Sequence, residues 1–317
     1  MSNPPFDSLI KTAERRGHYP VMLKEAVEIL SPADGLEYLD CTFGGGGHTR
    51  AILESANCRL TAIDRDPAAI SRAEEVKKEF PDRFKFVSAN FSEICNLQTD
   101  GGYAGIFFDF GVSSFQLDQS ERGFSFMRDG ALDMRMNPSA GYTALELIES
   151  LSEYELGKIL REYGEEPRFM KIARAVKAAA DARAISTTRE LAEVVAKAAP
   201  ASPREKIHPA TRTFQALRIA VNDELGEIER ALPAAFGLLA KGGVMAAISF
   251  HSLEDRIVKK FFKKVAGLPQ DRFDHSFVQD RVKLATLITR KPILPSDAEI
   301  SENTRSRSAK LRAVKKD

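Results

Sequence analysis

The run of consecutive glycines from Gly44 to Gly47 constrains this chain more than any other feature of its sequence. An apolar segment around Leu39 precedes the run, and apolar residues resume at Ala51, which together predict a strand, a tight turn and a helix. Because glycine has no Cβ atom, such a turn can adopt positive φ angles and let a ligand approach the backbone. The first N–H groups of the next helix point into the same space. The turn is therefore a candidate ligand-binding loop.

A second short strand, Leu60 to Ile63, ends at Asp64, roughly 20 positions beyond the loop. In nucleotide-binding sheets an acidic residue at this place binds the ribose hydroxyls. The dinucleotide pattern G-x-G-x-x-G fails at its last position, Thr49, and the chain has no Gly-Lys-Ser/Thr after the glycines. The loop therefore fits a nucleoside better than a pyrophosphate, and a structural turn without a ligand is the alternative.

Strands and helices alternate along the first part of the chain. An amphipathic helix is expected over 23–30, further strands over 84–87 and 105–109, and a helix that starts near Asp66-Pro67 and ends near Glu79. This alternation predicts an α/β fold with a doubly wound, mostly parallel sheet, whose ligands bind at the carboxyl ends of the strands. Polar or aromatic residues follow successive predicted strands at this edge: Asp40, Asp64, Asn90, Phe91 and Asp109. We expect them to share a ligand, although each alone could be a cap or turn residue.

Helical signals replace the alternation between residues 120 and 215. Ser152 with Glu155 and Thr187 with Glu190 have the spacing of capping boxes, and Ser202-Pro203 is typical of a helix start. The α/β pattern then returns, with helices expected over 224–239 and 255–264 and strands over 244–249, 283–289 and 308–314. Lys241-Gly242-Gly243 is expected to separate the first of these helices from its strand, and 269–280 is polar and has no assignment. The predicted organisation is a first α/β part (1–119), an inserted all-helical domain (120–215), and a second α/β part with a basic C-terminal tail (216–317).

Composition limits the partners and the compartment. The net charge is only +1, from 46 basic and 45 acidic residues, so a nucleic acid would have to bind local patches. The three cysteines, Cys41, Cys58 and Cys95, lack C-x-x-C spacing, which argues against a zinc site and a disulfide framework and favours the cytoplasm. Neither a signal peptide nor an apolar run long enough for a membrane span is apparent.

Polar groups also cluster after two strands, at 109–118 and at 248–256. Together with the glycine loop and the segments 121–136 and 208–215, this set of motifs resembles the bacterial small-subunit (16S) ribosomal RNA (cytosine-N4)-methyltransferases, from about His18 to Arg312. Phe110, Phe115 and the glycine at the middle of the loop depart from the usual pattern of that family, which affects details of the donor pocket.

The resemblance implies a class I S-adenosylmethionine-dependent methyltransferase fold. It implies that S-adenosyl-L-methionine is the methyl donor, and that the substrate is a cytidine in the decoding region of 16S ribosomal RNA, within the 30S subunit. A homodimer is compatible with the sequence. Carried over by motif, the donor contacts fall on Gly46, Gly47, His48, Asp64, Phe91, Asp109 and Gln116.

Methyl transfer to an exocyclic amine requires alignment and electrostatics more than a strong base. Asp109 is the candidate catalytic residue, with His251 and Ser249 as its partners. A C5-methyltransferase would instead need a nucleophilic cysteine, usually after proline, and no cysteine here follows proline. Phe124 and Phe126, with the nearby Arg122, are expected either to enclose a flipped cytidine or to bury a domain junction.

Two groups of basic residues are candidate phosphate contacts, or else solvated faces. They are Arg168, Lys171, Arg174 and Lys177 in the helical insertion, and Arg305, Arg307, Lys310, Arg312, Lys315 and Lys316 near the C-terminus. Two other functions compete with methylation. One is a nicotinamide-dependent oxidoreductase, disfavoured by the missing third glycine, and the other is a catalytically silent RNA-binding module.

Overall fold

The computed structural model describes residues 20–201, 207–271, 274 and 281–317. It divides into two compact units, one formed by Met1–Gly111 with Leu225–Asp317 and the other by Val112–Glu224. The second unit thus begins before and ends after the insertion expected over 120–215. In the described part of the chain no helix combines the length and the apolar character needed to cross a bilayer.

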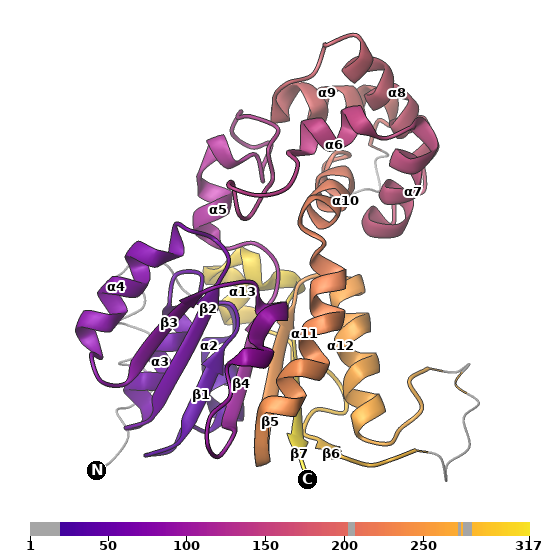
Figure 1. Cartoon of the computed structure of the whole chain (residues 1–317). Helices are drawn as coiled ribbons and strands as arrows, with labels where there is room; N and C mark the ends of the chain where they lie inside the picture. The colour runs from indigo at the N-terminus through magenta and orange to yellow at the C-terminus, as the bar shows by residue number, and fades with distance from the viewer. Residues whose placement is uncertain (1–19, 202–206, 272–273, 275–280) are drawn as a thin grey trace. The chain divides into compact units, whose positions relative to one another are not determined.

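The first unit is built on a seven-stranded sheet with the order β3-β2-β1-β4-β5-β7-β6 (Figure 1). Its strands are β1 (Glu37–Asp40), β2 (Arg59–Asp64), β3 (Phe84–Ser88), β4 (Tyr103–Asp109), β5 (Leu239–Ser249), β6 (Ala285–Leu287) and β7 (Lys310–Lys316). The first five strands are parallel, and β7 is antiparallel to both of its neighbours. The predicted mostly parallel, doubly wound sheet is confirmed.

Helices cover both faces of this sheet, and the strand sequences show why (Figure 1). Successive residues of a strand point to opposite faces. Accordingly Phe107 packs with the helices preceding β4, whereas Phe108 packs with α11 and α12. Because both faces are apolar, the central strand β4 is a nearly continuous hydrophobic run from Tyr103 to Phe108. The helical elements of this unit are α2 (Leu23–Leu30), α3 (Gly47–Ser55), α4 (Ala69–Glu79), η1 (Phe91–Asn96), α11 (Glu224–Leu238), α12 (Ser252–Val265), α13 (Asp297–Glu302) and η4 (Thr304–Ser308).

The second unit is helical and has its own apolar core. It contains α5 (Ser114–Asp118), η2 (Ser120–Arg122), α6 (Ala144–Ser150), α7 (Glu153–Gly164), α8 (Phe169–Asp181), α9 (Thr188–Ala198) and α10 (Thr211–Asn222). Both predicted capping boxes are present, at Ser152 with Glu155 and at Thr187 with Glu190. The Asn222 amide ties α10 to the preceding loop, because its Nδ2 donates to the Met134 carbonyl at 2.7 Å.

Several local expectations need correction. The Gly242-Gly243 pair does not separate a helix from a strand, because β5 already begins at Leu239. The two glycines lie where the pairing of β5 with β4 shifts register, between Tyr103 and Gly105 of β4. Helix α4 starts at Ala69, and Asp66 instead accepts the Ala68 N–H of the preceding turn at 3.0 Å. At the C-terminus, the strand expected over 308–314 is confirmed as β7, so the basic residues of that segment belong to the sheet. His18, the Ser202-Pro203 helix start and most of 271–280 lie outside the described residues.

Candidate active site

The glycine loop joins β1 to α3 and is fixed by its own backbone. The Phe43 N–H donates to the Ile63 carbonyl at 2.9 Å, and the Gly46 N–H donates to the Phe43 carbonyl at 2.7 Å. Gly46 caps α3 with a φ of 74°, and a Cβ atom there would lie 2.8 Å from the Phe43 ring. Glycine is therefore required at this position both by conformation and by space.

Asp64 ends β2 and faces this loop. Its Oδ2 accepts the Gly44 N–H at 2.7 Å, and its Oδ1 accepts the Asp66 N–H at 2.8 Å. These bonds fix the carboxylate, yet each oxygen keeps acceptor capacity for a hydroxyl group. Burial raises the pKa of Asp64. The Asp64 carboxylate is therefore a rigidly held hydrogen-bond acceptor beside the glycine loop.

Asp40, at the end of β1, is almost completely buried. Its carboxylate accepts the Thr42 N–H at 3.0 Å and the Thr49 hydroxyl at 2.7 Å. Burial nevertheless raises the pKa of Asp40 to about 6. Thr42 in turn accepts the Asp109 N–H on its hydroxyl at 2.6 Å, so the ends of β1 and β4 are linked.

Asp109 ends β4, and its carboxyl group is poorly satisfied. Among the described residues its buried Oδ1 has no hydrogen-bond partner. Burial, followed by the charges of Asp40 and Glu254, raises the pKa of Asp109 well above its usual range. An unsatisfied buried carboxyl group next to other carboxylates is costly. The site is thus suited to a ligand that brings positive charge or N–H donors.

His48 lies in the first turn of α3, next to Asp109. Its Nε2 is 3.0 Å from the Val21 carbonyl oxygen, which can only accept, so Nε2 carries the proton. Its Nδ1 lies 3.8 Å from Asp109 Oδ2, and its ring packs on Phe107 with 4.6 Å between centroids. These contacts fix the imidazole between the sheet and the entry to α2.

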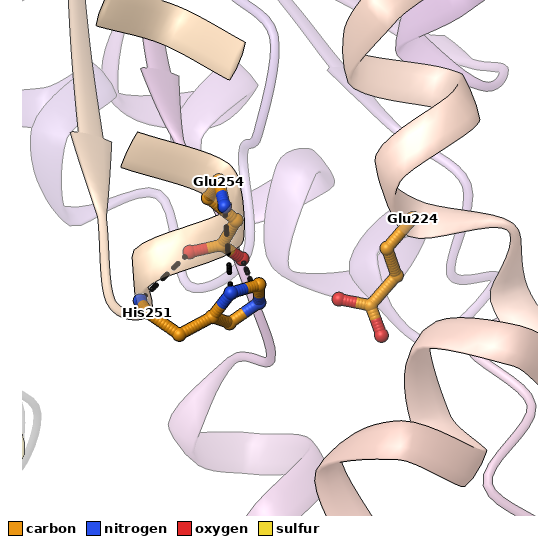
Figure 2. A group of neighbouring side chains, drawn as sticks. All are labelled: Glu224, His251 and Glu254. Carbon is orange, nitrogen blue, oxygen red and sulfur yellow. Dashed lines mark hydrogen bonds and ion pairs between the residues drawn. The ribbon is translucent and has the colours of Figure 1, made fainter. Parts of the chain in front are cut away.

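His251 and Ser249, the expected partners of Asp109, have other contacts. His251 caps α12, and its Nδ1 accepts the Glu254 N–H at 3.4 Å (Figure 2). Its Nε2 lies 3.0 Å from Glu254 Oε1, while Glu254 Oε2 accepts the Phe250 N–H at 2.7 Å. The Ser249 hydroxyl donates to the Lys310 carbonyl at 3.4 Å.

The sequence interpretation missed the buried carboxylate of Glu254, although its spacing from His251 is that of a capping box. Histidine is an unusual residue at the N-cap, which hid this signal. Figure 2 also shows Glu224, which is the first residue of α11 and the last residue of the second unit. Arg218 of the second unit donates to the Glu224 carboxylate at 2.7 and 2.9 Å.

The remaining predicted donor contacts lie in different units. Phe91 is the first residue of η1, and its ring centroid lies 6.0 Å from that of Phe108 and 6.0 Å from that of Phe110. Gln116 belongs to the second unit, where it is buried and forms a capping box with Ser113 at the start of α5. Gly47 begins α3, and a Cβ atom there would clash with the Pro20 ring.

The aromatic residues proposed to hold the target base are largely engaged within the second unit. Phe124 is only 7% exposed and belongs to the core of that unit. Arg122 donates to the carbonyls of Arg135 and Met136 at 3.0 and 2.9 Å. Phe126 is less buried and packs against His208, with 4.7 Å between ring centroids. For Phe124 the structure therefore favours a packing role.

Comparison with known proteins places the chain in one family. Residues 15–317 match the sequence profile described as the MraW methylase family. A protein from Rickettsia massiliae called "Ribosomal RNA small subunit methyltransferase H" is 46% identical over 303 residues, 95% of this chain and 98% of its own length. A protein of the same name from Gluconobacter oxydans is 48% identical over 306 residues, 96% and 94% of the two lengths. The crystal structure of an rRNA methylase from Streptococcus thermophilus superposes with a TM-score of 0.42 at 9% identity, covering 93% of each chain.

Proposed function

This chain belongs to the MraW methylase family, and on that premise we propose that it methylates the N4 amine of a cytidine in the decoding region of 16S ribosomal RNA. The coarser part follows from the family and fold: the chain is an S-adenosyl-L-methionine-dependent methyltransferase of small-subunit ribosomal RNA. The sheet order, with β7 antiparallel between β5 and β6, is that of the class I methyltransferase fold. This function displaces the oxidoreductase alternative.

The observation that carries the N4 assignment is the unsatisfied carboxyl group of Asp109. Because burial raises the pKa of Asp109, its ionised carboxylate is a stronger base than that of an ordinary aspartate. An exocyclic amine has N–H groups to offer such an acceptor. A C5-methyltransferase would need a thiolate, but burial raises the pKa of Cys41 and Cys58.

When bound, S-adenosyl-L-methionine supplies an electrophilic methyl group on a positively charged sulfur. In our proposal Asp64 binds the ribose hydroxyls, the backbone at Gly46 and Gly47 and the adjacent His48 line the donor, and Phe91 packs near the adenine. The cluster of buried carboxylates at the ends of β1 and β4 fits the positive charge of the donor. The resemblance also assigns Gln116 as a donor contact.

Asp109 acts on the acceptor amine. It accepts an N4–H group, which localises the lone pair on nitrogen and aligns it with the methyl carbon. The N–C bond forms as the carbon–sulfur bond breaks, and one N4 proton passes to the Asp109 carboxylate. His251 acts as a positioning residue, because it holds Glu254, whose charge contributes to the raised pKa of Asp109. Ser249 ties the end of β5 to β7.

The experiment is to map modified nucleotides in 16S ribosomal RNA from cells that lack this protein. Loss of an N4-methylcytidine, restored by the wild-type chain but not by Asp109→Asn, is expected. An unchanged set of modifications would contradict the proposed target. Methylation of assembled 30S subunits in preference to free RNA would support the proposed form of the substrate and a cytoplasmic location. If the chain were a silent RNA-binding module, the wild-type chain would not restore the missing N4-methylcytidine.

A further inference from the structure

Helix α12 has a strongly cationic solvent face. Its apolar side, which includes Val258, Phe262 and Val265, is buried against the sheet. Its basic residues recur at i, i+3, i+4, i+7 and i+8, the spacing of one helix face. They are Arg256, Lys259, Lys260, Lys263 and Lys264, which we call the α12 basic face. The two acidic residues of the helix, Glu254 and Asp255, are buried.

Among the described residues, acidic side chains pair with only part of this face. Lys260 pairs with Asp271 at 3.1 Å. Lys259, Lys263 and Lys264 make no ion pair with any residue in the part of the chain that the structure describes, and Lys259 and Lys264 are exposed. In a chain with a net charge of only +1, such a cluster concentrates positive charge locally.

Two of the C-terminal basic residues that the sequence offered for phosphate binding are used inside the protein. Arg312 is 8% exposed and binds the Asp255 carboxylate at 2.6 and 3.2 Å. Lys316 donates to the Phe236 and Leu239 carbonyls at 3.1 and 2.6 Å, and desolvation lowers the pKa of Lys316.

In the helical unit the stripe proposed for phosphate binding is also largely engaged. Lys177 donates to the Glu149 carbonyl at 2.7 Å and pairs with Asp181 at 3.4 Å. Arg168 donates to the Pro200 carbonyl at 2.7 Å. Within the described part of the chain, Lys259, Lys263 and Lys264 of the α12 basic face have no comparable set of internal contacts.

The position of α12 connects this face to the active site. The helix begins directly after His251, at the same sheet edge as Asp109, and runs alongside β5 and β7 (Figure 1). From Arg256 to Lys264 the face extends about 12 Å along the helix axis, at ~1.5 Å per residue. That length is enough to follow several phosphates of a nucleic-acid strand, at about 3.4 Å per phosphate.

We propose that the α12 basic face binds the phosphate backbone of the ribosomal RNA that flanks the target nucleotide. The inference rests on the proposed function for its substrate. A membrane surface is a poor alternative, because the apolar side of α12 is buried and unavailable for insertion. Flexible lysine side chains suit a sequence-independent backbone contact, in which each ammonium acts as a point charge.

The test compares Lys259→Gln/Lys263→Gln/Lys264→Gln with the wild-type chain. Binding to a fluorescent 16S fragment is measured at several salt concentrations. We expect binding to weaken about tenfold or more at low salt, and the slope of log affinity against log salt to fall by ~0.7 for each phosphate that the variant no longer neutralises. The matched control changes the exposed lysines Lys77, Lys78 and Lys85 at the opposite edge of the sheet and should leave both quantities unchanged. Replacing the same α12 lysines by arginine should preserve binding.

The outcomes separate the two proposals. If the glutamine variant keeps wild-type affinity and salt slope, the α12 inference is wrong, even if N4-methylation is observed. If the variant loses affinity for 30S subunits but not for free RNA, the face binds a ribosomal protein, which also overturns the inference. If the wild-type chain produces no N4-methylcytidine, the proposed function fails, whereas the binding data still decide the role of α12. Donor affinity, measured by calorimetry, should be equal in all variants.

Discussion

Burial gives Asp40 a titration that reaches the physiological range. Its pKa is raised to about 6 in the folded chain, so the folded state favours the protonated form. A carboxyl group with a raised folded-state pKa contributes stability that is complete below its ordinary pKa of 3.8 and is lost as pH rises through about 6. The charged form therefore opposes folding at neutral pH, despite its hydrogen bonds with Thr42 and Thr49.

Replacing Asp40 by Asn should remove this titration. The difference in unfolding free energy between the variant and the wild-type chain should increase in favour of the variant by about 1–2 kcal/mol as pH rises from about 5 to about 8. Urea denaturation at each pH measures this difference. The exposed Asp82→Asn is the control and should show no such trend. A stability difference for Asp40→Asn that does not change with pH would show that Asp40 keeps an ordinary pKa.

Asp109 should control the pH dependence of turnover. Because its pKa is raised well above the usual range and the ionised form must accept a proton, kcat should increase with pH through that raised value. Asp109→Asn should lower kcat about 100-fold or more and abolish the rising limb, as single-turnover rates with saturating donor would show. A variant that keeps the wild-type pH profile would exclude Asp109 as the proton acceptor.

Asp64 should matter mainly for donor affinity. An asparagine side chain at position 64 has only one acceptor oxygen. Asp64→Asn therefore removes the negative charge and one of the two hydrogen bonds that the Gly44 and Asp66 N–H groups donate to Asp64. Hydrogen bonds to charged groups contribute about 1.5–3 kcal/mol, so we expect the Kd for S-adenosyl-L-methionine to rise about 10- to 100-fold in calorimetry. A change of less than about twofold would mean that the ribose is held elsewhere.

At the level of secondary structure, the loop before α3 requires glycine at position 46, whereas Gly237 in α11 could be replaced by alanine. Gly46→Ala places a Cβ atom 2.8 Å from the Phe43 ring at a φ of 74°, and should destabilise the chain by about 1–3 kcal/mol and weaken donor binding. Gly237→Ala in α11, where nothing lies within 4 Å, should instead stabilise by about 0.5–1 kcal/mol. Thermal unfolding of both variants measures these opposite signs; the same sign in both would contradict the argument.

Periodicity made most elements predictable. The apolar spacing of Leu23, Ala26, Val27 and Leu30 defines α2, whose buried residues are the same four. Element ends were harder, because they depend on partners distant in sequence. The start of β5 depends on its pairing with Tyr103 of β4, and the start of α12 depends on a histidine cap that composition does not suggest.

For the molecule as a whole, alternating strands and helices sufficed to predict the fold class, and the capping boxes located the helical insertion. The fate of individual charged and aromatic residues could not be predicted in the same way, since it depends on burial. Arg312 and Phe124 were candidates for RNA contacts, yet one is a buried ion-pair partner and the other a core residue. The glycine loop and the strand-end aspartates could be predicted as one site, because the order of the strands alone brings them to one edge of the sheet.

The most direct test of the proposed reaction uses trideuteromethyl-labelled S-adenosyl-L-methionine and 30S subunits from cells lacking this enzyme. After incubation with the purified chain, the ribosomal RNA is digested to nucleosides, which are separated and identified by mass spectrometry. The account predicts the label in N4-methylcytidine, with little or none from Asp109→Asn. Label in C5-methylcytidine or another nucleoside, or no label from a chain that binds the donor, would contradict it.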